Sequence, residues 1–206
     1  MKNKKILLIL IIFIFYFIFY SFSYSYSISN DLEKNLFRLH ILANSDSTED
    51  QELKLYVRNK VIDYLHQYSF NNKSELITFL NNNQLSLQKV IDDAIKEKGY
   101  SYTSSFEIEN SFYPQKQYEN ITLPAGNYDG LKIKIGKAEG KNWWCVLFPP
   151  MCLINNSTCS LPEESEILLD NSLTAESCSV ISSNSSKYKF KFKIIEFNIE
   201  FFMIIV

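Results

Sequence analysis

The sequence predicts an α+β fold: an N-terminal membrane or signal helix, then one domain in which a helical segment precedes a mainly antiparallel sheet. Three patterns lead to this prediction. A long apolar run follows lysines at the N-terminus, apolar residues recur at helical spacing between residues 53 and 95, and apolar and polar residues alternate in several other segments. A chain of 206 residues is long enough for one domain with appendages.

The composition argues against one large class of function. Hydrophobic residues make up 46% of the chain and charged residues 21%, so a packed core is expected. The 21 Lys and Arg residues are balanced by 23 Asp and Glu residues, which gives a formal charge of −2. Because contacts to phosphates require a basic surface, this balance argues against nucleic-acid binding as the main task.

The N-terminus predicts export. Three lysines precede an unbroken apolar run over residues 6–20, and no acidic residue occurs before Asp31. A basic start followed by such a run is typical of a signal peptide, and the aromatic residues that follow extend it to membrane-spanning length. We therefore expect residues 1–28 to be either a cleaved signal peptide or a retained transmembrane anchor. Either way, residues 29–206 form a domain outside the cytoplasm.

The first part of this domain is predicted to contain one strand and three helices. Residues 36–44 alternate, which indicates a strand with one richer apolar face. Three serines stand before apolar residues at helical spacing, and we expect them to be N-caps: Ser47, Ser74 and Ser86. Gly99 follows the third helix, where a residue with positive φ is favoured.

Strands are predicted to follow. Residues 102–109 alternate up to a break at Pro114, residues 131–135 alternate with lysines, and residues 143–148 are apolar on both faces. The last two segments are expected to pair as a hairpin, in which an exposed strand precedes a central, buried one. The prolines that follow, Pro149 and Pro150, stop that strand because proline cannot donate to the ladder.

The C-terminal part is predicted to be loop-rich before a last strand. Residues 153–186 are rich in Asn, Ser and Thr, and we expect one short helix there, over residues 162–169, with loop elsewhere. Lysines then alternate with apolar residues, and the alternation shifts by one position within residues 187–201. This pattern predicts a strand with a β-bulge.

The cysteines agree with export, because disulfides form in oxidising spaces. There are four, an even number: Cys145, Cys152, Cys159 and Cys178. The first two flank the turn at Pro149 and Pro150, which can bring them together. Structural disulfides and buried free thiols are the alternatives. A metal site is disfavoured because no Cys-x2-Cys spacing occurs and both His40 and His66 lie far upstream.

Two blocks of the sequence resemble a known family. The first covers residues 38–51 and continues through Leu53-Lys54 and Val57-Arg58. The second begins at Pro124 and ends with the run Gly140-Lys141-Asn142-Trp143-Trp144-Cys145-Val146-Leu147-Phe148-Pro149-Pro150 and with Cys152. Together they resemble the stage II sporulation protein R family of endospore-forming bacteria, and residues 191–196 resemble its last strand. Residues 153–186 depart from the family pattern, so the pairing of Cys159 with Cys178 is left open.

The resemblance implies a signal between cells. A protein of this family is made in the forespore and exported into the space between the two septal membranes. There it activates a membrane-embedded aspartic protease of the mother cell, which cleaves the inactive precursor pro-sigma-E. The implied partners are therefore this protease and, through the N-terminal segment, the membrane. No cofactor, no small-molecule substrate and no catalysis are implied.

Two groups of residues are candidates for contact with the partner. Arg38, His40, Asn44 and Asp46 lie on or just after the first strand and are expected to form a polar patch. The alternative for His40 is a structural hydrogen bond to the turn that follows. Trp143 and Trp144 are either core residues or interface anchors, since interface energy concentrates in Trp and Tyr. As neighbours on a strand, they are expected to point to opposite faces.

The alternative function is an exported envelope hydrolase that uses Cys145 with His40 and an aspartate such as Asp46. Two observations weigh against it. Cys145 lies inside an apolar strand, where a buried thiol has a raised pKa and low reactivity, and Cys152 offers it a disulfide partner. We therefore assign no catalytic residue.

Overall fold

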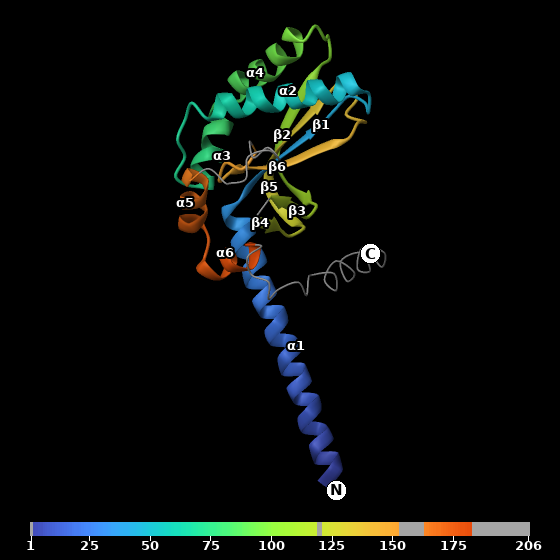
Figure 1. Ribbon diagram of the computed structural model, residues 1–206, viewed down its shortest axis with the longest axis vertical. Coiled ribbons are helices and arrows are strands. Elements are labelled where there is room, and N and C mark those ends of the chain that lie inside the picture. Colours follow the sequence, from blue (N-terminus) through green and yellow to red (C-terminus); the bar gives the residue numbers. More distant parts are fainter. Residues whose placement is uncertain (1, 119–120, 153–162, 183–206) are drawn as a thin grey trace.

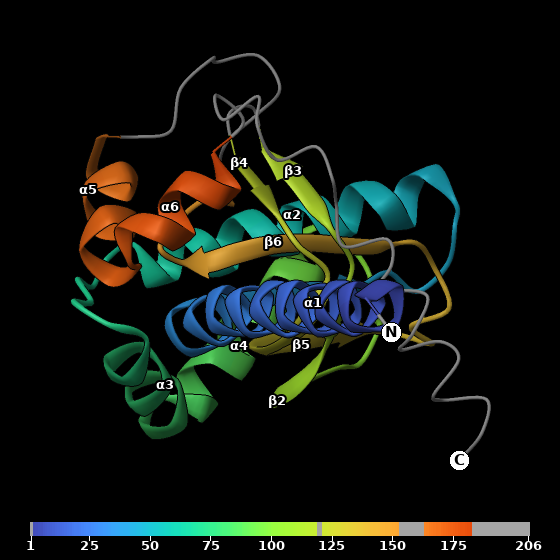
Figure 2. The same ribbon diagram turned by 90° about the horizontal axis from the view of Figure 1, so that it is seen from below.

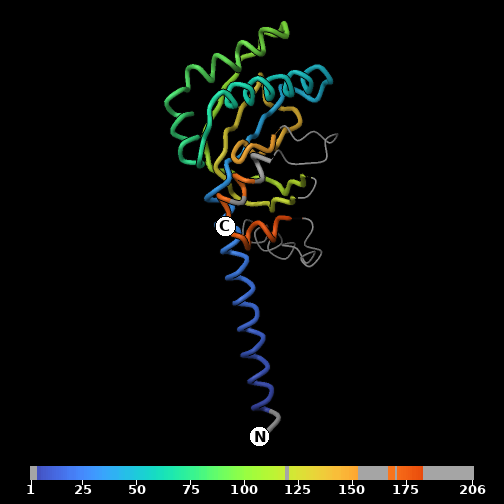
Figure 3. Tube along the Cα trace, turned by 60° about the vertical axis from the view of Figure 1, so that its left-hand side comes forward, coloured from blue at the N-terminus to red at the C-terminus, as the bar shows by residue number. Residues whose placement is uncertain are grey.

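The computed structural model describes residues 2–118, 121–152 and 163–182 (Figure 1). A single long helix, α1 (Lys2–Asn35), extends from a domain built of helices and a sheet. The N-terminus lies at the free end of this helix, far from the domain (Figures 1 and 3). The arrangement confirms the predicted α+β fold with its N-terminal apolar helix.

Helix α1 is exposed along its apolar first part and buried where it joins the domain. All side chains over residues 6–20 are exposed, and the helix is long and apolar enough to cross a membrane. Ile28 and Leu32 are buried, as is Leu36 directly after the helix. The helix is unbroken through residue 28, where the sequence predicted a domain boundary. The length and composition of this N-terminal helix are typical of a signal or an anchor.

The main sheet has four strands in the order β2-β5-β1-β6: β2 (Ser104–Tyr113), β5 (Gly126–Ile135), β1 (Phe37–Leu42) and β6 (Asn142–Phe148). Strand β1 is parallel to β5 and antiparallel to β6, and β2 is antiparallel to β5. The sheet is therefore mixed but mostly antiparallel, as the fold class requires.

The predicted hairpin between residues 131–135 and 143–148 is wrong. Strand β1 lies between β5 and β6, so β6 is an edge strand and β5 is interior. The connection over residues 136–141 crosses the end of β1 and does not make a tight turn. Neighbouring strands are about 4.8 Å apart, so six residues are enough to pass one strand. Periodicity fixes the face of each residue, but it does not fix which strands are neighbours.

Three helices cover one face of this sheet: α2 (Thr48–Leu65), α3 (Lys73–Asn82) and α4 (Gln84–Glu97). Their apolar residues pack against Phe37, Leu39 and Ile41 of β1 and against the inward side chains of β5. The alternation predicted for residues 36–44 is confirmed, because Arg38 and His40 point to the opposite face. Gly99 has the expected positive φ, of 81°.

The predicted helix starts are confirmed for one helix and wrong for two. The Ser47 side chain accepts a hydrogen bond from the Asp50 backbone N–H and caps α2. Asn72, not Ser74, caps α3, and α4 begins after Asn83 rather than at Ser86. Asn and Ser are nearly equal as caps, so sequence alone does not choose between neighbours.

A second layer lies on the other face of the sheet, around the end of α1. It contains the hairpin of β3 (Lys116–Tyr118) and β4 (Ile121–Leu123), and the helices α5 (Glu163–Ser172) and α6 (Ala175–Ile181). Figure 2 shows α6 beside β4, and an antiparallel bridge joins Ile121 to Ser182.

This layer confirms one expectation and corrects another. Helix α5 lies where the short helix was predicted. Helix α6 occupies residues that were expected to be loop. It has a local N-cap, because the Thr174 side chain accepts from Ser177 N–H, and Thr174 N–H and Oγ1 also donate to the carboxylate of Asp31 on α1. The contact with Asp31 is distant in sequence and gives no local signal. The predicted strand over residues 187–201 lies outside the described residues.

Candidate functional site

Two loops meet at the end of the sheet farthest from the N-terminus. We call residues 43–47 and 136–141 the distal loop pair; in Figure 1 they lie between β1 and α2 and between β5 and β6. The Asn44 side chain is the main link, because its Oδ1 accepts from Lys137 N at 3.0 Å. Asp46 Oδ1 accepts from Lys141 N at 2.6 Å, and Gly140 N donates to Ala43 O at 2.9 Å.

Glycines allow this close approach. Gly136 has φ of +58°, and a Cβ there would collide with the Asn44 side chain. A Cβ on Gly140 would likewise collide with the Ser45 carbonyl. The two loops therefore depend on residues without side chains at the points where they touch.

Two buried charges lie beneath the distal loop pair. The Asp50 carboxylate accepts from Ser45 Oγ at 2.5 Å and Asn44 Nδ2 at 2.8 Å. Burial alone would raise the pKa of Asp50, but these hydrogen bonds hold it below its usual value. The Lys54 ammonium donates to Lys141 O at 2.8 Å, and its burial lowers its pKa.

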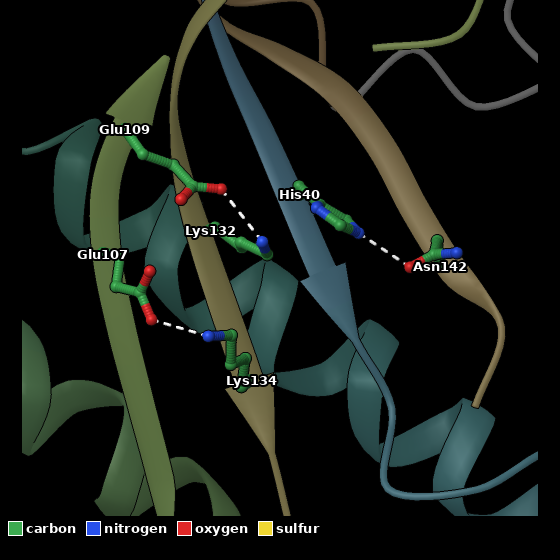
Figure 4. A network of polar contacts seen from close by, with 6 residues as sticks. All are labelled: His40, Glu107, Glu109, Lys132, Lys134 and Asn142. Carbon is green, nitrogen blue, oxygen red and sulfur yellow. Dashed lines mark hydrogen bonds and ion pairs between the residues drawn. The ribbon is translucent and has the colours of Figure 1, made fainter. Parts of the chain in front are cut away.

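His40 lies on the face of the sheet turned away from α2 and α4. Its Nε2 is 2.7 Å from Asn142 Oδ1 (Figure 4). Its ring stacks on Trp144, with centroids 3.6 Å apart. Burial lowers the pKa of His40; the Asn142 contact and Glu109 oppose this shift, and Lys132 adds to it. The expected structural bond from His40 to the following turn is wrong, because its partner lies on β6 instead.

Ion pairs continue this face across β5 and β2. Lys132 Nζ is 2.9 Å from Glu109 Oε1, and Lys134 Nζ is 2.6 Å from Glu107 Oε1 (Figure 4). The four side chains are partly exposed, so each pair contributes little to stability. They make this part of the sheet face polar, with charges of both signs.

Arg38 is separated from the rest of the predicted patch. Its side chain is fully buried, and its Nε donates to Cys145 O at 3.1 Å. Its guanidinium carbon lies 5.0 Å and 5.2 Å from the ring centroids of Tyr113 and Tyr128, as in a cation–π contact. The predicted patch is therefore divided: Arg38 is inside, His40 is on the sheet face, and Asn44 and Asp46 are in the distal loop pair.

The two tryptophans point to opposite faces, as expected. Trp143 packs with the helix-side core, and its ring centroid is 4.2 Å from the Arg58 guanidinium carbon. Trp144 lies on the other face against His40 and Tyr113. Both are partly buried, so they contribute to packing, and contact with a partner stays a prediction for each.

A disulfide joins Cys145 to Cys152 across the turn, with Cα atoms 5.2 Å apart. The structure does not bring Cys145 and His40 together, because their side chains point to opposite faces of the sheet and the sulfur is bonded to Cys152. The thiol–imidazole pair of the hydrolase alternative is therefore not assembled. Cys178 lies on α6, and Cys159 lies outside the described residues, so their pairing stays a prediction.

Sequence reasoning gave no role to Lys54 or Asn142, and it treated Asp50 only as an acidic residue at the start of a helix. Lys54 and Asn142 lie within the two blocks quoted above, and the blocks lie side by side in the structure: β1 and the start of α2 contact the connection that leads into β6. The available signal for Lys54 was its charge at a position where the periodicity of α2 predicts a buried residue. Nothing in the local sequence indicated the pairing of Asn142 with His40.

Comparison with known proteins identifies the family. Residues 33–158 match the family model described as stage II sporulation protein R (spore_II_R). The chain belongs to the stage II sporulation protein R family. Membership implies a role in sporulation. The matched residues of this stage II sporulation protein R chain contain the whole sheet, the disulfide and the distal loop pair.

A curated relative supports the assignment. Stage II sporulation protein R of Bacillus subtilis (strain 168) is 32% identical over 131 residues, which cover 63% of this chain and 58% of that protein. The chain thus matches less than two thirds of the length of this relative. No solved structure matches the chain.

Proposed function

We propose that this protein is an exported signal of endospore formation that activates a membrane-embedded aspartic protease and so triggers the processing of pro-sigma-E. It is exported across the forespore membrane into the space between the two septal membranes, where α1 either is removed or retains it. It acts by binding, without a cofactor or a small-molecule substrate. The family match over residues 33–158 carries the proposal.

Three features of the chain support it. Helix α1 has the length and composition of a signal or an anchor. The Cys145–Cys152 disulfide is suited to an oxidising space outside the cytoplasm. Hydrogen bonds of the Asn44 side chain to Asp50 and to Lys137 N–H hold the loops at one end of the sheet in place, so the domain presents an ordered surface there, as a binding signal needs. By linkage, it must bind the active state of the protease more tightly than the inactive state.

The test is co-expression of the full chain, the protease and pro-sigma-E in a bacterium that does not sporulate. We expect cleavage of pro-sigma-E when all three are present and none without the chain, measured by immunoblot. The double substitution Phe13→Asp and Phe17→Asp interrupts the apolar run and should abolish both export and cleavage. Cleavage by the non-exported variant, or none by the exported wild type, would contradict the proposal.

A further inference from the structure

A retained α1 fixes the height of the domain above the membrane. Residues 6–25 are twenty in number. At about 1.5 Å per residue they span roughly 30 Å, the thickness of the hydrocarbon core. Lys4 and Lys5 then lie at the cytoplasmic surface, and Tyr24 and Tyr26 lie at the outer one, where aromatic rings are favoured.

The domain begins almost directly at that outer surface. Ile28, three residues beyond the span, is already buried in the core with Leu32 and Leu36. The Lys73 ammonium donates to Glu33 O at 2.6 Å and pairs with Asp129 at 2.7 Å, which ties the last turn of α1 to α3 and β5. No flexible linker separates the span from the domain, so α1 is a rigid stalk.

The stalk gives the domain a lower and an upper end. Helix α6 and β4 contact each other beside the end of α1, so they face the membrane that α1 spans (Figures 1 and 2). Only Leu36 separates α1 from β1, and β1 continues upward to the distal loop pair (Figure 1). The distal loop pair therefore lies at the end of the sheet away from that membrane, where the connection from α4 to β2 also lies (Figure 1).

We propose that the distal loop pair is the surface that contacts a protein embedded in the facing membrane, through a polar segment that this protein exposes between the two membranes. This inference rests on the proposed function, whose protease lies in that membrane. The surface suits a polar partner, because Asp46, Lys137, Glu139 and Lys141 are all exposed and carry charges of both signs.

The same surface is preorganised. The backbone N–H groups of Lys137 and Lys141 are held by the side chains of Asn44 and Asp46, and Glu139 N donates to Asn44 O at 3.3 Å. A loop that is already ordered loses little conformational entropy on binding. Asn44 and Asp46 are thus positioning residues, and the side chains of Lys137 and Glu139 are the contacts.

This division of roles supplies a test that does not disturb the fold. Because the loop is held through backbone groups, charge reversal at Lys137 or Glu139 changes the surface alone. Lys137→Glu is matched by Lys89→Glu on the exposed side of α4, and Glu139→Lys is matched by Glu176→Lys on α6. Each full-length variant replaces the wild type in the forespore of a sporulating cell, where the chain and the protease lie in facing membranes, and cleavage of pro-sigma-E is followed by immunoblot. The melting temperature of each variant is measured after purification in detergent.

We expect Lys137→Glu and Glu139→Lys each to slow cleavage of pro-sigma-E at least tenfold with an unchanged melting temperature. The controls should stay within twofold of the wild type. If the wild type is active and the distal variants match their controls, the inference is overturned and the proposed function stands. If the wild type itself gives no cleavage, the proposed function fails, and the inference fails with it.

Discussion

His40 is a buried histidine whose surroundings shift its pKa. It is buried between Trp144 and Asn142, and its pKa is lowered from its ordinary value of 6.5 by burial, against the Asn142 contact. Because the folded pKa is below the unfolded one, protonation favours unfolding. The stability that neutral His40 contributes is present above pH 6.5 and is lost as the pH falls toward the folded pKa.

We therefore expect His40→Gln to flatten the rise in the free energy of unfolding between about pH 5 and pH 7, measured by urea unfolding. Gln keeps a polar group near Asn142 but does not titrate. His66→Gln is the matched control, because His66 is exposed at the end of α2. An unchanged slope in the His40 variant would show that another group is responsible.

At this scale, the sequence predicted which face each residue of β1 takes but not how deep it lies. Arg38 and His40 share the face expected for them. Arg38 is nevertheless fully buried, since the end of α1 and the β3–β4 hairpin cover its part of the face. The alternation of apolar and polar residues does not show which elements from distant parts of the chain will pack over a strand.

The disulfide acts on the element scale, because it closes the turn that follows β6. Cys145 and Cys152 are seven positions apart, so the loop is short. In the chain-entropy model such a closure contributes about 2.5 kcal/mol. We expect the double substitution Cys145→Ala and Cys152→Ala to lower the free energy of unfolding by about this amount, measured by urea unfolding without reductant.

Reductant extends the same experiment. Wild-type protein in reductant should lose at least as much stability as the double variant. A further loss when the double variant itself is reduced would indicate that Cys159 and Cys178 also pair. If instead the double variant is as stable as the oxidised wild type, the turn is held by packing and the bond is not needed.

Individual helices and strands could be predicted where local signals agree, but the order of the strands in the sheet could not. The helix α2, its Ser47 cap and the strand β1 follow from periodicity and capping within a few residues. The order β2-β5-β1-β6 depends on pairing between residues about ninety to one hundred and ten positions apart, such as Arg38 with Gly130 and Val146. No local pattern encodes such pairing.

The stability of the whole domain depends on the last turns of α1. Ile28, Leu32 and Leu36 are buried, and each such side chain contributes roughly 1.5–3 kcal/mol. A chain that starts at Tyr26 keeps all three, whereas one that starts at Phe37 loses them. We expect the shorter chain to lose about 5 kcal/mol, which is comparable to the total stability of many domains.

Urea unfolding followed by tryptophan fluorescence measures this difference, because Trp143 and Trp144 lie in the two layers of the core. The chain that starts at Tyr26 serves as the matched control for soluble expression. Equal urea midpoints for the two chains would show that the last turns of α1 do not stabilise the domain. Whether the chain is cut near residue 28 stays a prediction from the sequence.

The central position of β1 has a consequence for how the chain crosses a membrane. This strand is the first part of the sheet to emerge when export proceeds from the N-terminus, yet both of its neighbours, β5 and β6, follow about ninety residues or more later. The sheet cannot close until residue 148 has passed through, and such distant pairing is slow. In the export proposed above, late closure would keep the polypeptide unfolded during translocation, so the order of its strands would delay folding until most of the domain is outside.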